Sequence, residues 1–189
     1  MKKKLVYLTL IVLLLNNTMQ AQNNIKPKNG YTPQTGVIVT MLKDLKSRVT
    51  QSVEKLNQDE VDFLLDENAN RIGAMILHLA ATEKYYQVFT FENRGFTTEE
   101  NEKWLVPLEL GDTARKQLIN KPISYYLDIW NDIRSETLDL LKTKDDKWLN
   151  SKVKRANMNN HWAWYHVMEH QANHMGQIRF VMKRMPETN

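Results

Sequence analysis

The 189-residue sequence contains no cysteine, only six glycines and five prolines, and no strong excess of charge of either sign. The lack of cysteine excludes disulfides, thiolate nucleophiles and thiolate metal ligands, so His, Asp or Glu would have to hold any metal ion. The absence of long alternating apolar and polar runs argues against a sheet-rich fold. Lysine and arginine are mixed with acidic residues, so charge does not indicate a nucleic-acid partner.

A long hydrophobic run is also absent, because the apolar stretch Leu5–Leu15 has only 11 residues. A membrane-spanning helix needs about 20. The stretch follows three lysines and precedes Ala21, the pattern of a signal peptide with a cleavage site. We therefore predict that residues 1–21 are a signal peptide cut between Ala21 and Gln22, and that the protein is periplasmic or secreted with no membrane span after cleavage. An uncleaved anchor is the alternative; a lipoprotein anchor is excluded because no cysteine follows.

The rest of the chain is dominated by helical periodicity. We expect a flexible leader at 22–35, helices at about 36–56, 71–91, 122–143 and 160–185, and a tail at 186–189. Asn70 is the expected N-cap of the second helix, and Pro122 is expected in the first turn of the third. A long connection, 93–121, has room for a short helix near Thr98–Trp104. Four amphipathic helices predict an all-α, four-helix bundle over residues 36–185.

Three of the five histidines lie in the segment "HVMEHQANHMGQIRF" of the last helix. His170 and His174 are four residues apart, so they lie about 40° apart on the face that carries the apolar residues. His78, in the second helix, lies opposite the polar positions Gly73, Lys84 and Gln87 and should also point inward. We therefore predict that His78, His170 and His174 bind one metal ion in the bundle core and leave a coordination position open. The alternative is that each is an ordinary, hydrogen-bonded core histidine.

His166 lies nearer the edge of the apolar face, as a half-exposed residue or a residue at the mouth of a pocket. Residues 166–170, "HVMEH", also match the inverted zinc-peptidase pattern, but a third ligand is lacking downstream and Glu169 points away from His170. Asn173 and Gln177 are candidate orienting groups. We expect Glu83 to form an ion pair at the edge of its helix. The alternative is that Glu83 supports the metal ligands. We expect Trp162 and Trp164 to pack within the bundle.

The segments "LHLAATEKYY" and "HVMEHQANHMGQI" together resemble the DinB-like family. The family pattern has one histidine in an L-H-x-A-x-x-E helix and two in a late H-x-x-x-H-x-G-Q segment, which correspond here to His78, His170 and His174. The resemblance covers most of residues 36–185. It implies a four-helix bundle that binds a divalent ion, often zinc or nickel, with three histidines, and frequently a homodimer.

Characterised members of that family include transferases and isomerases that use small thiols such as bacillithiol or mycothiol. The resemblance thus implies a metal-dependent transferase or hydrolase acting on a small molecule. The predicted export departs from the pattern of these enzymes, because it places the protein outside the cytoplasm, where such thiols are kept reduced and abundant. A periplasmic or stress-related bundle with a structural ion is the non-catalytic alternative, and an interaction module without metal is a third. The sequence names no general base and no substrate.

Overall fold

The computed structural model describes residues 24–186. The predicted signal peptide and residues 187–189 of the predicted tail lie outside this range. Within it the secondary structure consists of helices and contains no strand, which confirms the all-α fold. The four long helices are α2 (Pro33–Val53), α4 (Ile72–Gln87), α7 (Ile123–Lys142) and α9 (Asn160–Met182).

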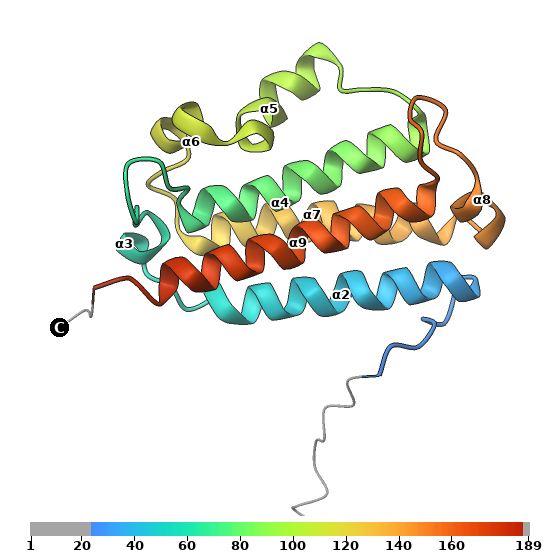
Figure 1. Ribbon diagram of the computed structural model, residues 1–189, viewed down its shortest axis with the longest axis horizontal. Coiled ribbons are helices and arrows are strands. Elements are labelled where there is room, and N and C mark those ends of the chain that lie inside the picture. The colour runs from blue at the N-terminus through green and yellow to red at the C-terminus, as the bar shows by residue number, and fades with distance from the viewer. Residues whose placement is uncertain (1–23, 187–189) are drawn as a thin grey trace, which may run out of the picture.

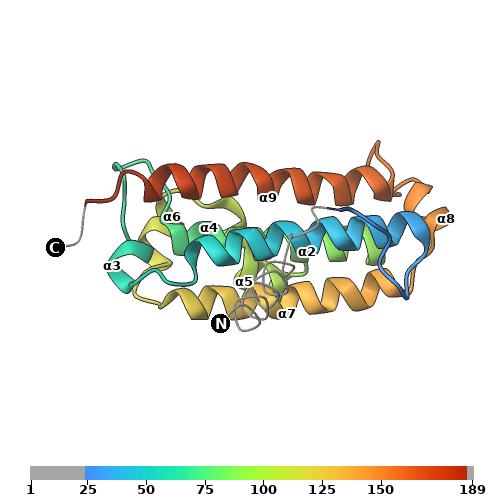
Figure 2. The same ribbon diagram turned by 90° about the horizontal axis from the view of Figure 1, so that it is seen from below.

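The long helices lie side by side along the long axis of the molecule (Figure 1). Helix α4 packs against α7 and α9, and α2 packs against the same two helices from the opposite corner of the bundle (Figure 2). No helix in the described range is long and apolar enough to cross a membrane.

Four short helices lie in the connections: α3 (Gln58–Val61), α5 (Thr98–Glu109), α6 (Gly111–Gln117) and α8 (Asp146–Asn150). The predicted long connection holds α5 and α6, and α5 packs on the outer side of α4 (Figure 1). Thr97 and Glu100 form a capping box at the start of α5, which satisfies backbone donors at that end. This helix extends five residues beyond the expected Trp104.

Two predicted helix ends were wrong in detail. Arg71, rather than Asn70, is the N-cap of α4, and its side chain makes no capping hydrogen bond. Pro122 is the N-cap of α7 instead of a residue of its first turn. Helix α4 continues as a π-helix, η1 (Val88–Glu92), and the chain then turns at Asn93 with φ of 56°. Asparagine tolerates this left-handed conformation better than most residues.

The start of α2 is held by a residue of α8. Asp146 accepts hydrogen bonds from the backbone N–H groups of Gln34 and Thr35, both at 3.1 Å, and from the Thr32 hydroxyl. The Tyr31 hydroxyl donates to the Leu138 carbonyl of α7 at 3.1 Å. The last residues of the predicted leader are therefore fastened to the bundle, and α2 begins at 33 rather than 36.

Helix α4 is buried nearly all round, because α7, α9 and α5 surround it. The sequence pattern placed Gly73, Lys84 and Gln87 on the side of this helix that faces away from the core, and this prediction was wrong. Gly73 contacts the ring of Tyr126, and Gln87 donates to the Ile133 carbonyl at 2.9 Å and to Thr137 at 2.8 Å. This side of the helix faces α7.

Candidate metal centre

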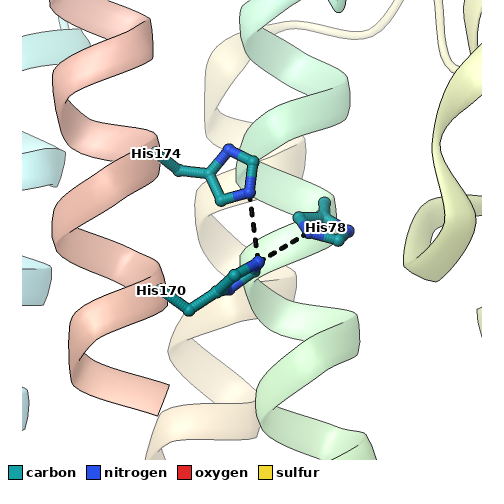
Figure 3. A group of neighbouring side chains, drawn as sticks. All are labelled: His78, His170 and His174. Carbon is teal, nitrogen blue, oxygen red and sulfur yellow. Dashed lines mark hydrogen bonds between the residues drawn. The ribbon is translucent and has the colours of Figure 1, made fainter. Parts of the chain in front are cut away.

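The side chains of the three histidines point toward one another between α4 and α9 (Figure 3). His170 Nε2 lies 3.0 Å from His78 Nε2 and 3.1 Å from His174 Nε2. All three potential ligand atoms lie within 4.8 Å of one another. Residues 92 positions apart in the chain are thus brought to one point by the antiparallel packing of α4 on α9.

Hydrogen bonding fixes the tautomer of His78. Its Nδ1 lies 2.9 Å from the carbonyl oxygen of Pro107, which can only accept, so Nδ1 carries the proton and Nε2 presents a lone pair. Pro107 belongs to the last turn of α5, where carbonyls lack partners within the helix. Helix α5 therefore orients a potential metal ligand through a backbone atom.

Hydrogen bonds between the imidazoles cannot account for both short Nε2–Nε2 contacts of His170. With a lone pair on His78 Nε2, a proton on His170 Nε2 could be donated to His78 or to His174, but not to both. The cluster therefore fits a cation bound by three Nε2 lone pairs. A neutral imidazole nitrogen is the usual histidine ligand of divalent zinc and nickel.

Burial also favours the neutral imidazoles that a metal requires. Burial, followed by the charges of the neighbouring histidines, lowers the pKa of His170 to about 3. Burial and the charge of His78 lower the pKa of His174 to about 4, against a hydrogen bond to the Gln177 side chain that raises it. Burial likewise lowers the pKa of His78, although its backbone hydrogen bonds oppose the shift. At neutral pH the cluster is three uncharged nitrogen donors.

The cluster does not lie in the centre of the bundle, where the sequence interpretation had placed it. His78 is buried, but His170 and His174 are half-buried at the edge of the apolar face of α9. This partial exposure leaves part of the cluster open to solvent.

The bundle centre holds a charged network instead. Arg134 of α7 donates to the Glu83 carboxylate of α4 at 2.6 and 2.7 Å, to Gln171 of α9 at 3.2 Å, and to the Leu42 carbonyl of α2. One side chain thus links all four long helices. Glu83 has no exposed surface, so the expected ion pair at a helix edge was wrong. Burial raises the pKa of Glu83, but the charge and hydrogen bonds of Arg134 outweigh it and the pKa is lowered.

His166 is not part of the cluster of potential ligands. Its ring stacks on Trp162, with centroids 5.1 Å apart and planes 9° apart, and Nδ1 lies 3.3 Å from the exposed Glu169 carboxylate. The "HVMEH" pentapeptide therefore does not form a metal site with Glu169 beside the ion. Trp164 is fully buried as expected, but Trp162 is 46% exposed and lies on the surface.

Asn173 and Gln177 line a cavity of about 550 Å³ that begins one helical turn from the histidines. Met75, three residues before His78, forms part of the opposite wall. Gly176 opens the cavity further, because a Cβ added there would meet no atom within 4 Å. The remaining lining residues are Asn68, Ala69, Asn70, Phe180 and Val181. The lining is rich in side-chain amides and contains no charged group.

A group of aromatic side chains lies on the other side of the cluster, toward the start of α9. It consists of Trp162, His166 and Tyr86, and the ring centroid of Tyr86 is 5.8 Å from that of His166. The centroid of His166 is 6.1 Å from that of His170. We call this the aromatic surface. The sequence interpretation missed it, although the spacing of Trp162, His166 and His170 by four residues was a visible signal.

The bundle and its three-histidine cluster define the class of protein as a DinB-like metal-binding bundle. Residues 37–185 match the family model for mycothiol-S-transferase, and the chain belongs to this family. The match covers the four long helices except the first turn of α2, and it confirms the DinB-like resemblance. Family and cluster together support a divalent metal ion. No curated protein matches the chain with significant similarity.

Proposed function

We propose that this protein is an exported metal-dependent transferase that joins a small thiol to a second small molecule at His78, His170 and His174. The proposal rests on one observation: the surfaces on the two sides of the histidine cluster differ in chemistry. An amide-rich cavity lies on one side and the aromatic surface on the other. A hydrolase needs room for one organic substrate and water, whereas a transferase must hold two organic substrates that differ.

In this arrangement the three imidazoles would hold a zinc or nickel ion, and the Pro107 carbonyl keeps His78 in the tautomer whose Nε2 is free to bind it. When bound, the ion would coordinate the sulfur of a thiol and lower its pKa, which supplies a thiolate at neutral pH. Asn173 and Gln177 offer amide hydrogen bonds to the polar body of the thiol. The aromatic surface offers a planar, apolar contact to the molecule that receives the sulfur. A carbon–sulfur bond forms, the leaving group departs with its electron pair, and the thiol proton passes to solvent.

The test uses untagged protein loaded with zinc or nickel and supplied with mycothiol, bacillithiol or glutathione together with chlorodinitrobenzene. Chromatography should show the thiol adduct forming faster than without protein, and His170→Ala should abolish the increase. Hydrolysis of ester or amide substrates without thiol would instead assign a hydrolase. An inert protein that unfolds on chelation would assign a structural ion in a non-catalytic bundle.

Export and assembly belong to the same proposal. The sequence "MKKKLVYLTLIVLLL" and the following Ala21 support a cleaved signal peptide. Fractionation of cells that produce the full chain should place the protein outside the cytoplasm, with Gln22 as its first residue. A cytoplasmic protein that retains Met1 would reject export. We also propose that the protein is a homodimer, which light scattering of the purified protein tests. We propose no nucleic-acid partner, because the basic residues are mixed with acidic ones.

A further inference from the structure

A second cavity, of about 400 Å³, lies between α2 and α7, whereas the histidine cluster lies between α4 and α9. Its lining includes three basic residues, Lys43, Lys46 and Arg134, and one acidic residue, Glu54. The wall also contains Leu138 and four polar side chains that could donate hydrogen bonds: Ser47, Thr50, Gln51 and Asn131. The side chains around this cavity therefore carry an excess of positive charge.

Lys46 is an unusual member of this wall because its side chain is only 8% exposed. Its ammonium group donates to the Asn131 side chain and lies 4.8 Å from the centre of the Trp130 ring. Among the described residues no carboxylate lies within ion-pair distance of it. A buried ammonium without a counter-ion is costly, and such groups are normally paired.

The nearby carboxylates do not supply the missing charge. Glu83 is buried, but its oxygens already accept hydrogen bonds from Arg134, Trp130 and Thr137. Asp128 is exposed and acts on Lys46 only from a distance. Burial and the charge of Arg134 lower the pKa of Lys46 to about 8, against the opposite effect of Glu83 and Asp128.

We propose that the cavity between α2 and α7 binds a small oxyanion, a carboxylate or phosphate group, with Lys46 as its counter-ion. An ammonium has three N–H donors, and Asn131 accepts from it in the unliganded protein. The Thr50 hydroxyl is buried without a hydrogen-bond partner and lies in the same wall, so it is a second donor. The volume limits the ligand to a small molecule. This site is independent of the proposed transferase activity, because it uses neither the histidines nor the cavity beside them.

Thermal unfolding of the metal-loaded protein tests the proposal, with acetate or inorganic phosphate compared with chloride at equal ionic strength. One of the two oxyanions should raise the melting temperature by several degrees more than chloride does, because a ligand that binds only the folded state stabilises it. Lys46→Met, which keeps the apolar stem, should lose this response. Lys142→Met is the matched control, since Lys142 is an exposed lysine of α7 that does not line the cavity, and it should retain the response.

Nitrogen NMR of the Lys46 side chain in the wild-type protein provides a measurement that does not depend on the variant folding. The oxyanion should raise the pKa of Lys46 from about 8 toward the ordinary value for lysine. Equal responses of wild type and Lys46→Met, or the absence of both a thermal response and a pKa change, would overturn the proposal. The His170→Ala variant should bind the oxyanion normally, which separates this site from the metal centre.

Discussion

His170 is the central member of the metal cluster, because its Nε2 contacts the Nε2 atoms of both His78 and His174. We expect His170→Ala to weaken zinc or nickel binding by more than about 100-fold, since loss of a ligand should exceed the 10–100-fold effect of losing a supporting partner. Mass spectrometry and chelator competition on untagged protein measure this. His166→Ala is the control and should bind metal normally. A His170→Ala variant with wild-type affinity would reject the ligand assignment.

The lowered pKa values of the cluster predict how the metal-free protein responds to acid. The pKa values of His170 and His174 are about 3 and about 4 in the folded protein, against 6.5 for the unperturbed group. Between these values the unfolded chain binds more protons than the folded one, so the free energy of unfolding falls as the pH decreases below about 6.5. Urea denaturation between about pH 7.5 and about pH 5 measures the slope. The pH dependence of the free energy of unfolding should be smaller in the double variant His170→Gln/His174→Gln. An equal pH dependence in the variant and the wild type would show that these two histidines do not cause it.

Glu83 and Arg134 form a buried ion pair whose partners depend on each other. We expect Glu83→Gln to lower the free energy of unfolding by about 3–5 kcal/mol, because Arg134 keeps a buried charge without its counter-ion. Lys84→Ala breaks the neighbouring pair with the half-exposed Glu136 and should cost at most about 1 kcal/mol. Urea unfolding compares the two. The double variant Glu83→Leu/Arg134→Leu should recover part of the loss; similar losses for Glu83→Gln and Lys84→Ala would show that the pair contributes little.

At the scale of the elements, the crossing of α4 and α7 depends on a glycine. A Cβ at Gly73 would lie 2.5 Å from a ring carbon of Tyr126 and 2.9 Å from a methyl group of Val61. Real Cβ atoms do not approach so closely, so the helices would have to separate. We expect Gly73→Ala to destabilise the protein by about 1–3 kcal/mol through overpacking.

Gly176 on α9 is the matched control, because a Cβ there meets no atom within 4 Å. Alanine favours a helix over glycine by about 1 kcal/mol, so Gly176→Ala should be neutral or stabilising. Thermal and urea unfolding of both variants measure the difference. If Gly73→Ala is as stable as Gly176→Ala, the close contact between α4 and α7 is not a constraint.

Helix α5 and the segment around Trp162 show how elements build the site without supplying metal ligands. The carbonyl of Pro107 orients His78 from α5, a helix that the sequence predicted only as a short segment ending near Trp104. A backbone carbonyl carries no sequence signature, so its part in the site could not be read from the residue type. The stacking of Trp162 on His166 likewise depends on side-chain directions that a helical wheel does not resolve.

At the scale of the whole molecule, two clusters of buried apolar residues form the core. One cluster of buried residues is built around Trp130, Tyr126 and Ile76, and a second around Trp164 and Leu42. Apolar burial over four long helices is the main force that drives such a bundle to fold, so we expect the bundle to form without the ion.

We accordingly expect the chelated protein to keep its helical circular dichroism at 25 °C. Addition of zinc or nickel at about 100 times its dissociation constant should stabilise the fold by about 2.7 kcal/mol. For a chain of this size that corresponds to a rise in melting temperature of about 5–10 °C. Calorimetry with and without metal measures both quantities. Loss of helical signal on chelation would instead assign the ion a structural role.

The amino-acid sequence by itself determined the fold class and the pair His170 and His174, because helical periodicity and i,i+4 spacing are local properties. It also placed His78 on the inward face of its helix, while the packing of α4 on α9 brings His78 to the pair. It also excluded thiolate ligands through the lack of cysteine. Only the tertiary structure decided where the cluster lies, which face of α4 meets α7, and that Arg134 with Glu83 fills the bundle centre. These features depend on how one helix packs on three others. Since α4 is covered on almost every side, its own polar pattern could not reveal which neighbour each residue would meet.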